Sequence, residues 1–150
     1  MEMESAKVTG AIVLELRDKD GALKESREVK NVITTAGKTY LAAWLAAASQ
    51  AGAFMGYVGL GTGTNAANAA DTDLQTPFSP AARAAGVLTS AVNVWQSVAT
   101  FGAGVCTGAI TEAGVFSAAT AGTLMAHQVF SVINKGSADS LSVTWQITFS

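Results

Sequence analysis

The residue types that most often perform chemistry are scarce in this chain, which has one histidine, His127, and one cysteine, Cys106. A catalytic triad needs a nucleophile with a recognisable local signature, and none accompanies His127. His127 alternates with Met125 and Val129, so we interpret it as a strand residue whose ring is hydrogen-bonded. Cys106 lacks the positive setting of a reactive thiolate, and we interpret it as inert. One cysteine also excludes an intrachain disulfide and a multi-cysteine metal site.

A glycine-rich segment runs from Val58 to Thr76 (VGLGTGTNAANAADTDLQT) and superficially resembles a dinucleotide-binding fingerprint. A phosphate-binding loop must open a helix and needs a third glycine in register or a Gly-Lys-Ser/Thr ending, and neither is present. The Thr, Asn and Asp residues that follow Gly63 favour turns closed by side-chain-to-backbone hydrogen bonds. The segment therefore predicts a shaped loop after a strand.

Two acidic residues, Asp71 and Asp73, stand near the end of this segment. A calcium loop would require further acids at fixed steps and a final glutamate, so turn or capping roles are the stronger interpretation. We expect a short helical turn over Asp71 to Thr76, capped by Asp71 or Thr72, before Pro77 and Pro80 interrupt regular pairing.

Arg83 and Glu112 are isolated charges in otherwise uncharged stretches of sequence. A charge in such surroundings is costly unless it is satisfied, which leads to the hypothesis that the two form an ion pair. The pair would hold the segment after Pro80 to the turn before Val115. The alternative is that both are unrelated surface charges.

The charged residues are concentrated at the start of the chain: fourteen of the twenty lie in residues 1–38, and six lie in the final 112. Ordinary soluble domains contain about 25% charged residues. The poor charge content predicts a surface rich in Ser, Thr, Asn and Gln that is partly buried against other chains, because interface cores are depleted of charge. The net charge of −2 excludes the basic footprint of a nucleic-acid-binding protein.

Two strands and one helix are expected in the first third of the chain. Val8 to Arg17 alternates in polarity, Asp18 to Gly21 is typical of a turn, and Leu23 to Ile33 completes a charged hairpin. Apolar residues then recur at helical spacing, which predicts a helix over Ala36 to Gln50 capped by Thr34 or Thr35.

The rest of the chain predicts further strands, of which the last is the clearest. Within it Trp145 should be buried between Val143 and Ile147, because apolar residues alternate with Ser, Thr and Gln. The fold class that follows is mostly β: an antiparallel sandwich or barrel-like domain over residues 8–150, with seven or eight strands and one helix closing an end. The further expected strands are Phe54–Leu60, Ala82–Thr89, Val92–Phe101, Ile110–Phe116, Leu124–Ile133 and Leu141–Phe149.

Residues 1–7 are expected to form an extended N-terminal arm, because this segment of mixed charge has too little apolar surface to fold alone. Its interface candidates are Met1, Glu2, Met3 and Glu4. The segment lacks the pattern of a signal peptide, and no apolar run approaches the roughly 18 residues of a membrane span. We therefore expect a soluble chain made in the cytoplasm, with no membrane partner.

Several of these segments together resemble a family of small structural proteins of tailed bacteriophages. The resemblance covers residues 58–149. It rests on the order and spacing of VGLGTG at Val58, DTDLQ at Asp71, Arg83, ITEAGVF at Ile110, Leu124-Met125, Phe130, Lys135 and DSLSVTWQI at Asp139.

The resemblance implies a β-rich virion protein, commonly a homotrimer, with no enzymatic activity and no cofactor. Members of this group are capsid decoration (cement) proteins or tail and fibre components. The implied partners are other copies of the chain and either the major capsid protein or tail proteins, with capsid decoration the first hypothesis. A tail or fibre component that binds a host receptor or carbohydrate through residues 61–71 is the alternative. An obligate trimer would bury more than roughly 2,000 Å² in total.

Overall fold

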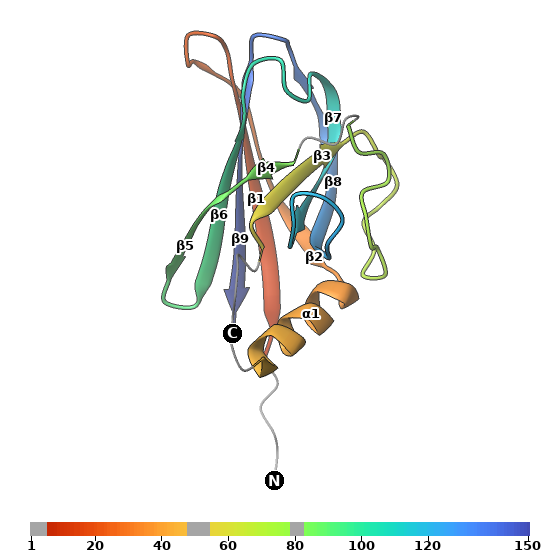
Figure 1. Cartoon of the computed structure of the whole chain (residues 1–150). Helices are drawn as coiled ribbons and strands as arrows, with labels where there is room; N and C mark the ends of the chain where they lie inside the picture. The colour runs from red at the N-terminus through yellow and green to blue at the C-terminus, as the bar shows by residue number, and fades with distance from the viewer. Residues whose placement is uncertain (1–5, 48–54, 79–82) are drawn as a thin grey trace.

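The computed structural model describes residues 6–47, 55–78 and 83–150, and the mostly-β, barrel-like fold with one helix is confirmed (Figure 1). Nine strands are present among these residues, where seven or eight were expected, because the stretch predicted over residues 82–89 is divided at Gly86. The elements are β1 (Val8–Arg17), β2 (Leu23–Ile33), α1 (Thr35–Ala46), β3 (Tyr57–Gly61), β4 (Ala84–Ala85), β5 (Val87–Ala91), β6 (Val94–Phe101), β7 (Gly108–Phe116), β8 (Leu124–Lys135) and β9 (Ser140–Phe149).

The nine strands form one antiparallel sheet in the order β4-β3-β7-β8-β2-β1-β9-β6-β5. One half consists of the long, regular pairings of β2, β1, β9, β6 and β5, and the other of β8, β7, β3 and β4. Only the last two residues of β2, Val32 and Ile33, pair with β8, so the halves diverge from this point and curve around a common interior.

The two ends of the sheet are brought together by one bent stretch of chain, residues 84–91. Its first part, β4, pairs with β3, and its second part, β5, pairs with β6, which nearly closes the barrel. The bend is at Gly86, whose amide donates to the carbonyl oxygen of Gly56 at 2.8 Å. A Cβ at this position would lie 1.9 Å from the Ser97 hydroxyl, so the close crossing requires glycine.

The barrel interior contains the apolar faces predicted from alternation. Trp145 is fully buried in β9, with Val143 and Ile147 buried on the same face, as predicted. Its partners across the sheet are Ile12 of β1 and Ser97 of β6, both also fully buried.

Helix α1 lies across one end of the barrel, beside the start of β1 (Figure 1). Thr34 is its N-cap, because its hydroxyl accepts from the amide of Gly37 at 2.9 Å, as expected for one of the two candidate caps. The predicted end at Gln50 is wrong: the helix stops at Ala46, and Ala47 is extended. In the part of the chain that the structure describes, no helix has both the length and the apolarity needed to cross a membrane.

The N-terminal arm falls largely outside the described residues, since Met1, Glu2, Met3 and Glu4 are not among them. Lys7, the last residue assigned to the arm, is held by the domain itself. Its backbone exchanges two hydrogen bonds with Ser150, of 2.6 and 2.9 Å. An arm that reaches another subunit therefore begins before Lys7.

Candidate functional site

The covering loop, residues 62–77, lies over the outer surface of β3, β7 and β8 (Figure 1). Beneath it a second, smaller core forms outside the barrel, where Leu74 of the loop packs on Phe116 of β7 and Leu124 of β8. The polar contacts that fix the loop gather beside this core. These contacts join ionisable side chains of the covering loop, β7 and β8, and we treat the cluster as the candidate site.

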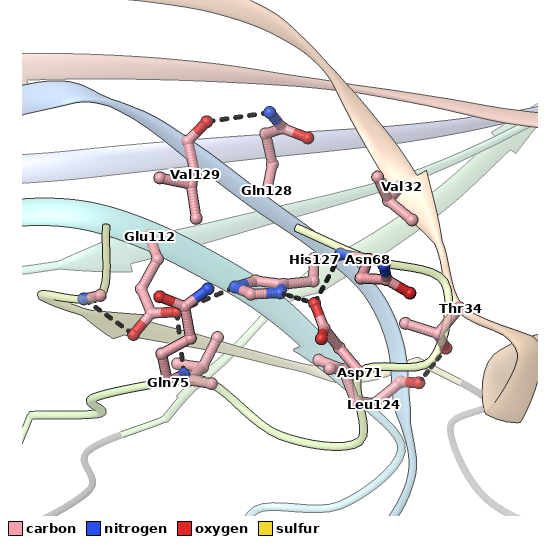
Figure 2. A network of polar contacts seen from close by, with 12 residues as sticks. Val32, Thr34, Asn68, Asp71, Gln75, Glu112, Leu124, His127, Gln128 and Val129 are labelled. Carbon is pink, nitrogen blue, oxygen red and sulfur yellow. Dashed lines mark hydrogen bonds and ion pairs between the residues drawn. The ribbon is translucent and has the colours of Figure 1, made fainter. Parts of the chain in front are cut away.

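His127 of β8 is at the centre of the cluster, fully buried between two carboxylates (Figure 2). Its Nδ1 lies 2.7 Å from Oδ2 of Asp71 in the covering loop, and its Nε2 lies 2.8 Å from Oε2 of Glu112 in β7. Neutral imidazole carries one N–H, so both contacts are hydrogen bonds from the ring only when the imidazole is protonated. The arrangement therefore favours imidazolium between two carboxylates.

The Glu112 carboxylate is also fully buried and joins the two ends of the covering loop to the sheet. Its Oε1 accepts from the amides of Gly63 at 3.0 Å and Thr76 at 2.7 Å, and its Oε2 accepts from the amide of Gln75 at 3.0 Å. With His127 this makes four donors to one carboxylate. Such a group is a strong structural anchor, because charge-assisted hydrogen bonds are the stronger ones.

The glycine-rich segment has its shape because the loop passes so close to Glu112. A Cβ at Gly61 would lie 2.5 Å from Oε1 of Glu112, and a Cβ at Gly63 would lie 2.5 Å from Oε1 of Gln75. The prediction of a shaped loop after a strand is confirmed. These glycines make room for a buried carboxylate and its backbone donors, which accounts for their spacing without a phosphate ligand.

The pKa values reflect this mutual stabilisation. Burial alone lowers the pKa of His127, but the hydrogen bonds to Glu112 and Asp71 outweigh it and hold that pKa above its ordinary value of 6.5. Burial raises the pKa of Glu112, but the bonds from His127 and the loop amides hold it below 4.5. The pKa of Asp71 is also lowered: burial opposes the shift, and the Asn68 amide and His127 cause it.

This geometry suits a structural role for the cluster. Both ring nitrogens of His127 are occupied by carboxylates and the ring is shielded from solvent, so it has no free position from which to exchange a proton with a bound molecule. Within residues 6–47, 55–78 and 83–150 no group of three or more His, Cys, Asp and Glu is arranged to hold a metal ion. What the cluster does is tie Asp71, and with it the middle of the covering loop, to the sheet.

The pH dependence of stability should have two limbs. The raised pKa of His127 contributes stability that is complete below pH 6.5 and is lost as pH rises through the folded-state pKa. The lowered pKa of Glu112 contributes stability that is complete above pH 4.5 and is lost as pH falls through its folded-state value. Urea unfolding across this range should show the maximum between the limbs. Because His127 is the only histidine, His127→Gln should remove the His-linked loss on the alkaline side, and an unchanged profile would contradict the assignment.

The proposed ion pair between Arg83 and Glu112 is wrong. Glu112 is satisfied by His127 and three amides, whereas the Arg83 guanidinium stacks on the Phe116 ring, 3.4 Å from its centroid. Arg83 also donates from Nη1 to the carbonyl oxygens of Ala118 at 2.8 Å and Ala121 at 2.6 Å. The alternative of two surface charges is also wrong for Glu112. Each residue fixes a loop, but through different partners.

Double-mutant cycles should distinguish the contact of Arg83 with Phe116 from the ion pair of Arg83 with Glu112. Arg83→Ala combined with Phe116→Leu should show a coupling of roughly 1 kcal/mol, the range for a partly shielded cation–π contact. The matched cycle of Arg83→Ala with Glu112→Gln should show coupling near zero. The free energy of unfolding in urea measures both. A larger coupling in the second cycle would restore the ion pair.

The other candidate residues have mixed outcomes. The predicted helical turn over Asp71 to Thr76 is wrong, because Asp71 is directed to His127 and the Asn68 amide instead of capping a helix. The turn roles predicted for the two acidic residues are confirmed, because Asp73, like Asp71, accepts a hydrogen bond from a loop amide, that of Leu74. Cys106 is buried, and burial raises the pKa of its thiol although Lys135 opposes the shift, which agrees with an inert thiol.

Sequence reasoning missed that Glu112, His127 and Asp71 belong together, although one signal was present. In the β7–β8 hairpin Gly114 is paired with His127, and Glu112 is two residues from Gly114 on the same face. The strand register alone therefore places Glu112 and His127 as diagonal neighbours on one face, whereas the space over Gly114 is filled by Leu124 and Leu74 of the second core. No comparable local signal identifies Asp71, which is 56 residues away along the chain.

Comparisons with protein-family models, with curated proteins and with solved structures gave no match. The described residues thus form a nearly closed, nine-stranded antiparallel barrel with an external loop fixed by a carboxylate–histidine–carboxylate cluster, in which His127 and Glu112 are buried and Asp71 is partly exposed.

Proposed function

We propose that this protein is a virion structural subunit that decorates a bacteriophage capsid and stabilises it by bridging neighbouring subunits. The observation that carries the proposal is the position of the residues behind the phage resemblance. Gly61, Gly63, Asp71 and Gln75 lie in or beside the covering loop, and Glu112, which belongs to a distant segment of the resemblance, holds that loop through the amides of Gly63 and Gln75. The resemblance therefore rests on residues with a shared architectural task, which supports a common fold and role.

The charge distribution favours the same role. The described residues from Ala84 to Thr111 contain no charged side chain, and this stretch includes three strands of the barrel wall, β4, β5 and β6. Surfaces of this kind suit contact with other protein chains, because charged groups are costly to desolvate at an interface core. The implied partners are further copies of the chain, as a homotrimer, and the major capsid protein or tail proteins. The site of action is the virion, with the capsid surface favoured over the tail.

The bridging element in this proposal is the N-terminal arm, shortened to the residues before Lys7. Fully extended, the six residues before Lys7 span at most about 22 Å. The arm departs beside Ser150, where β1 begins and β9 ends. An extended segment that adds to the sheet edge of a neighbour gains main-chain hydrogen bonds with little demand on side-chain identity.

A particle-protection assay tests this function. Particles prepared without the chain should disassemble at a lower temperature, and adding the purified full-length chain should restore the original temperature. The chain lacking residues 1–5 should keep its own melting temperature but protect particles less well. Equal protection by both chains would remove the arm from the mechanism, and a full-length chain that does not bind particles would contradict capsid decoration.

A tail or fibre component that binds a host receptor or carbohydrate is the second candidate, and the rigidity of the covering loop favours it. The Asn65 amide donates to Oε1 of Gln75 at 2.9 Å, and Nε2 of Gln75 donates back to the Asn65 carbonyl oxygen at 2.5 Å. Thr64, Asn65 and Asn68 are exposed on this fixed loop. A preorganised polar loop loses less entropy on binding. Adsorption of the purified chain to host cells, lost on Asn65→Ala, would support this alternative over the first.

A further inference from the structure

The outward side chains of β5, β6 and β9, together with the first three outward side chains of β1 (Thr9, Ala11 and Val13), form a continuous surface without charge, which we name the uncharged face. Its central row crosses the four strands through Thr89, Gln96, Gln146 and Ala11, which are paired in register. The flanking rows on the same strands contain only Val, Ala and Thr. None of these side chains is buried. The face is therefore available to another molecule over the width of four strands.

The nearest charges lie at the margin of the face, on β2 and at the next outward positions of β1, where Glu15 and Arg17 form an ion pair. Lys30 is paired with Ala11 at the end of the central row, and Glu28 is paired with Val13 in the neighbouring row. They have opposite signs, so the margin adds no net charge. The twelve positions of the face itself are uncharged, and the charge that comes closest to its centre is Lys30, which lines the far side of the hollow over β1 and β9.

The surface shape of the uncharged face is centred on Gln146. Nε2 of Gln146 donates to Oε1 of Gln96 at 2.8 Å, which makes the two amides a ridge across β9 and β6. A shallow hollow lies on each side of Gln146, one of about 340 Å³ over β5 and β6 and one of about 250 Å³ over β1 and β9. A central ridge between two hollows is a shape that can interlock with its own copy.

Exposed apolar residues stand at both ends of β5. Val87 is 70% exposed, and Val92, in the turn that follows β5, is 105% exposed. Val92 also has a φ of 55°, a conformation that is rare for a β-branched residue. Apolar side chains kept in water at such a position would be stabilised by burial against another chain.

We infer that copies of this chain pack together through the uncharged face, around a symmetry axis that passes close to Gln146. Near such an axis each side chain meets its own equivalent, so any charge there would face a like charge. A face that is neutral across twelve consecutive outward positions meets this requirement. The inference rests on the proposed function, since it names the contact through which copies of the subunit meet.

A charge at the centre of the face tests the inference. Light scattering coupled to gel filtration should give a multiple of the 15.2 kDa chain mass for the native protein and the monomer mass for Gln146→Lys. Gln146 is exposed in the single chain, so the variant should stay folded as a monomer with an unchanged circular dichroism spectrum. Its melting temperature should fall only by the stabilisation that self-association gives the native protein. The matched control is Ser131→Lys, on the exposed surface of β8, which should keep the native mass.

Cross-linking gives a second measurement that does not depend on disrupting the interface. Gln146→Cys should form a disulfide-linked dimer under mild oxidation, whereas Ser131→Cys should not, and the buried Cys106 should not compete. A native protein that is monomeric at micromolar concentration, or a Gln146→Lys variant that keeps the native mass, would overturn the inference. If Gln146→Lys keeps its mass but no longer binds particles, the face contacts another protein; the self-contact is then wrong and the proposed function stands.

Discussion

Replacing Trp145 by alanine should lower the free energy of unfolding by about 3–5 kcal/mol, the range for deleting a large aromatic side chain from a core. Trp145 is fully buried in β9 between Ile12 and Ser97 on the adjacent strands. Its indole N–H has no hydrogen-bond partner among the described residues, so lost packing, not a lost hydrogen bond, causes the effect. Urea unfolding measures the change.

The matched control for this substitution is an outward position of the same strand that lies beyond the uncharged face. Ser142 is paired with Thr100 and Glu15 and is not buried, so Ser142→Ala should change the free energy of unfolding by no more than about 0.5 kcal/mol. Similar losses in both variants would mean that the face assignment of β9 is wrong.

Replacing Glu112 by alanine should have an effect of comparable size, about 3–5 kcal/mol, because removing one partner of a buried ion pair leaves the other uncompensated. Here the substitution also leaves three loop amides, those of Gly63, Gln75 and Thr76, without their acceptor. The covering loop should loosen as a unit. Hydrogen exchange at these three amides should therefore accelerate together with the fall in stability.

Two further variants sharpen this prediction. Glu28→Ala removes an exposed glutamate of β2 and should be nearly neutral. Glu112→Gln keeps the shape and one acceptor oxygen, which can still accept from the amides of Gly63 and Thr76. It removes the charge and the second acceptor that faces the Gln75 amide and His127, so its loss should be smaller than that of Glu112→Ala but not negligible. Equal losses for glutamine and alanine would show that charge, not the amide contacts, dominates the role of Glu112.

The parts of the fold that the sequence predicts well are those with strict alternation. In β9 every second residue from Leu141 to Ile147 is buried, as the pattern requires. The β1–β2 hairpin follows the same logic, since a period of two determines which face is covered. In β7 and β8 the alternation fails, because residues 112–116 and 124–127 are buried on both faces, under the second core as well as in the barrel. The helix cap at Thr34 is a local signal of the same quality.

The parts that the sequence does not predict depend on contacts between distant segments. Nothing local to Glu112 shows that its partners come from residues 63, 75, 76 and 127, and its isolation in sequence pointed to Arg83 instead. The glycine at the bend, Gly86, is a second example, because its role becomes clear only from its closeness to Ser97 on another strand. Backbone amides are invisible to an argument that pairs charges by residue type, and they are the main partners of Glu112.

The central claim is that this chain is a stoichiometric part of a phage capsid, and its copy number in purified particles tests that most directly. Quantitative mass spectrometry of particles from the strain that encodes the chain should give an amount comparable to that of the major capsid protein. When capsid shells and tails from these particles are separated, the chain should be found with the shells and not with the tails. A chain that is absent from purified particles would contradict the account, and one present in only a few copies that remain with the tail would contradict capsid decoration.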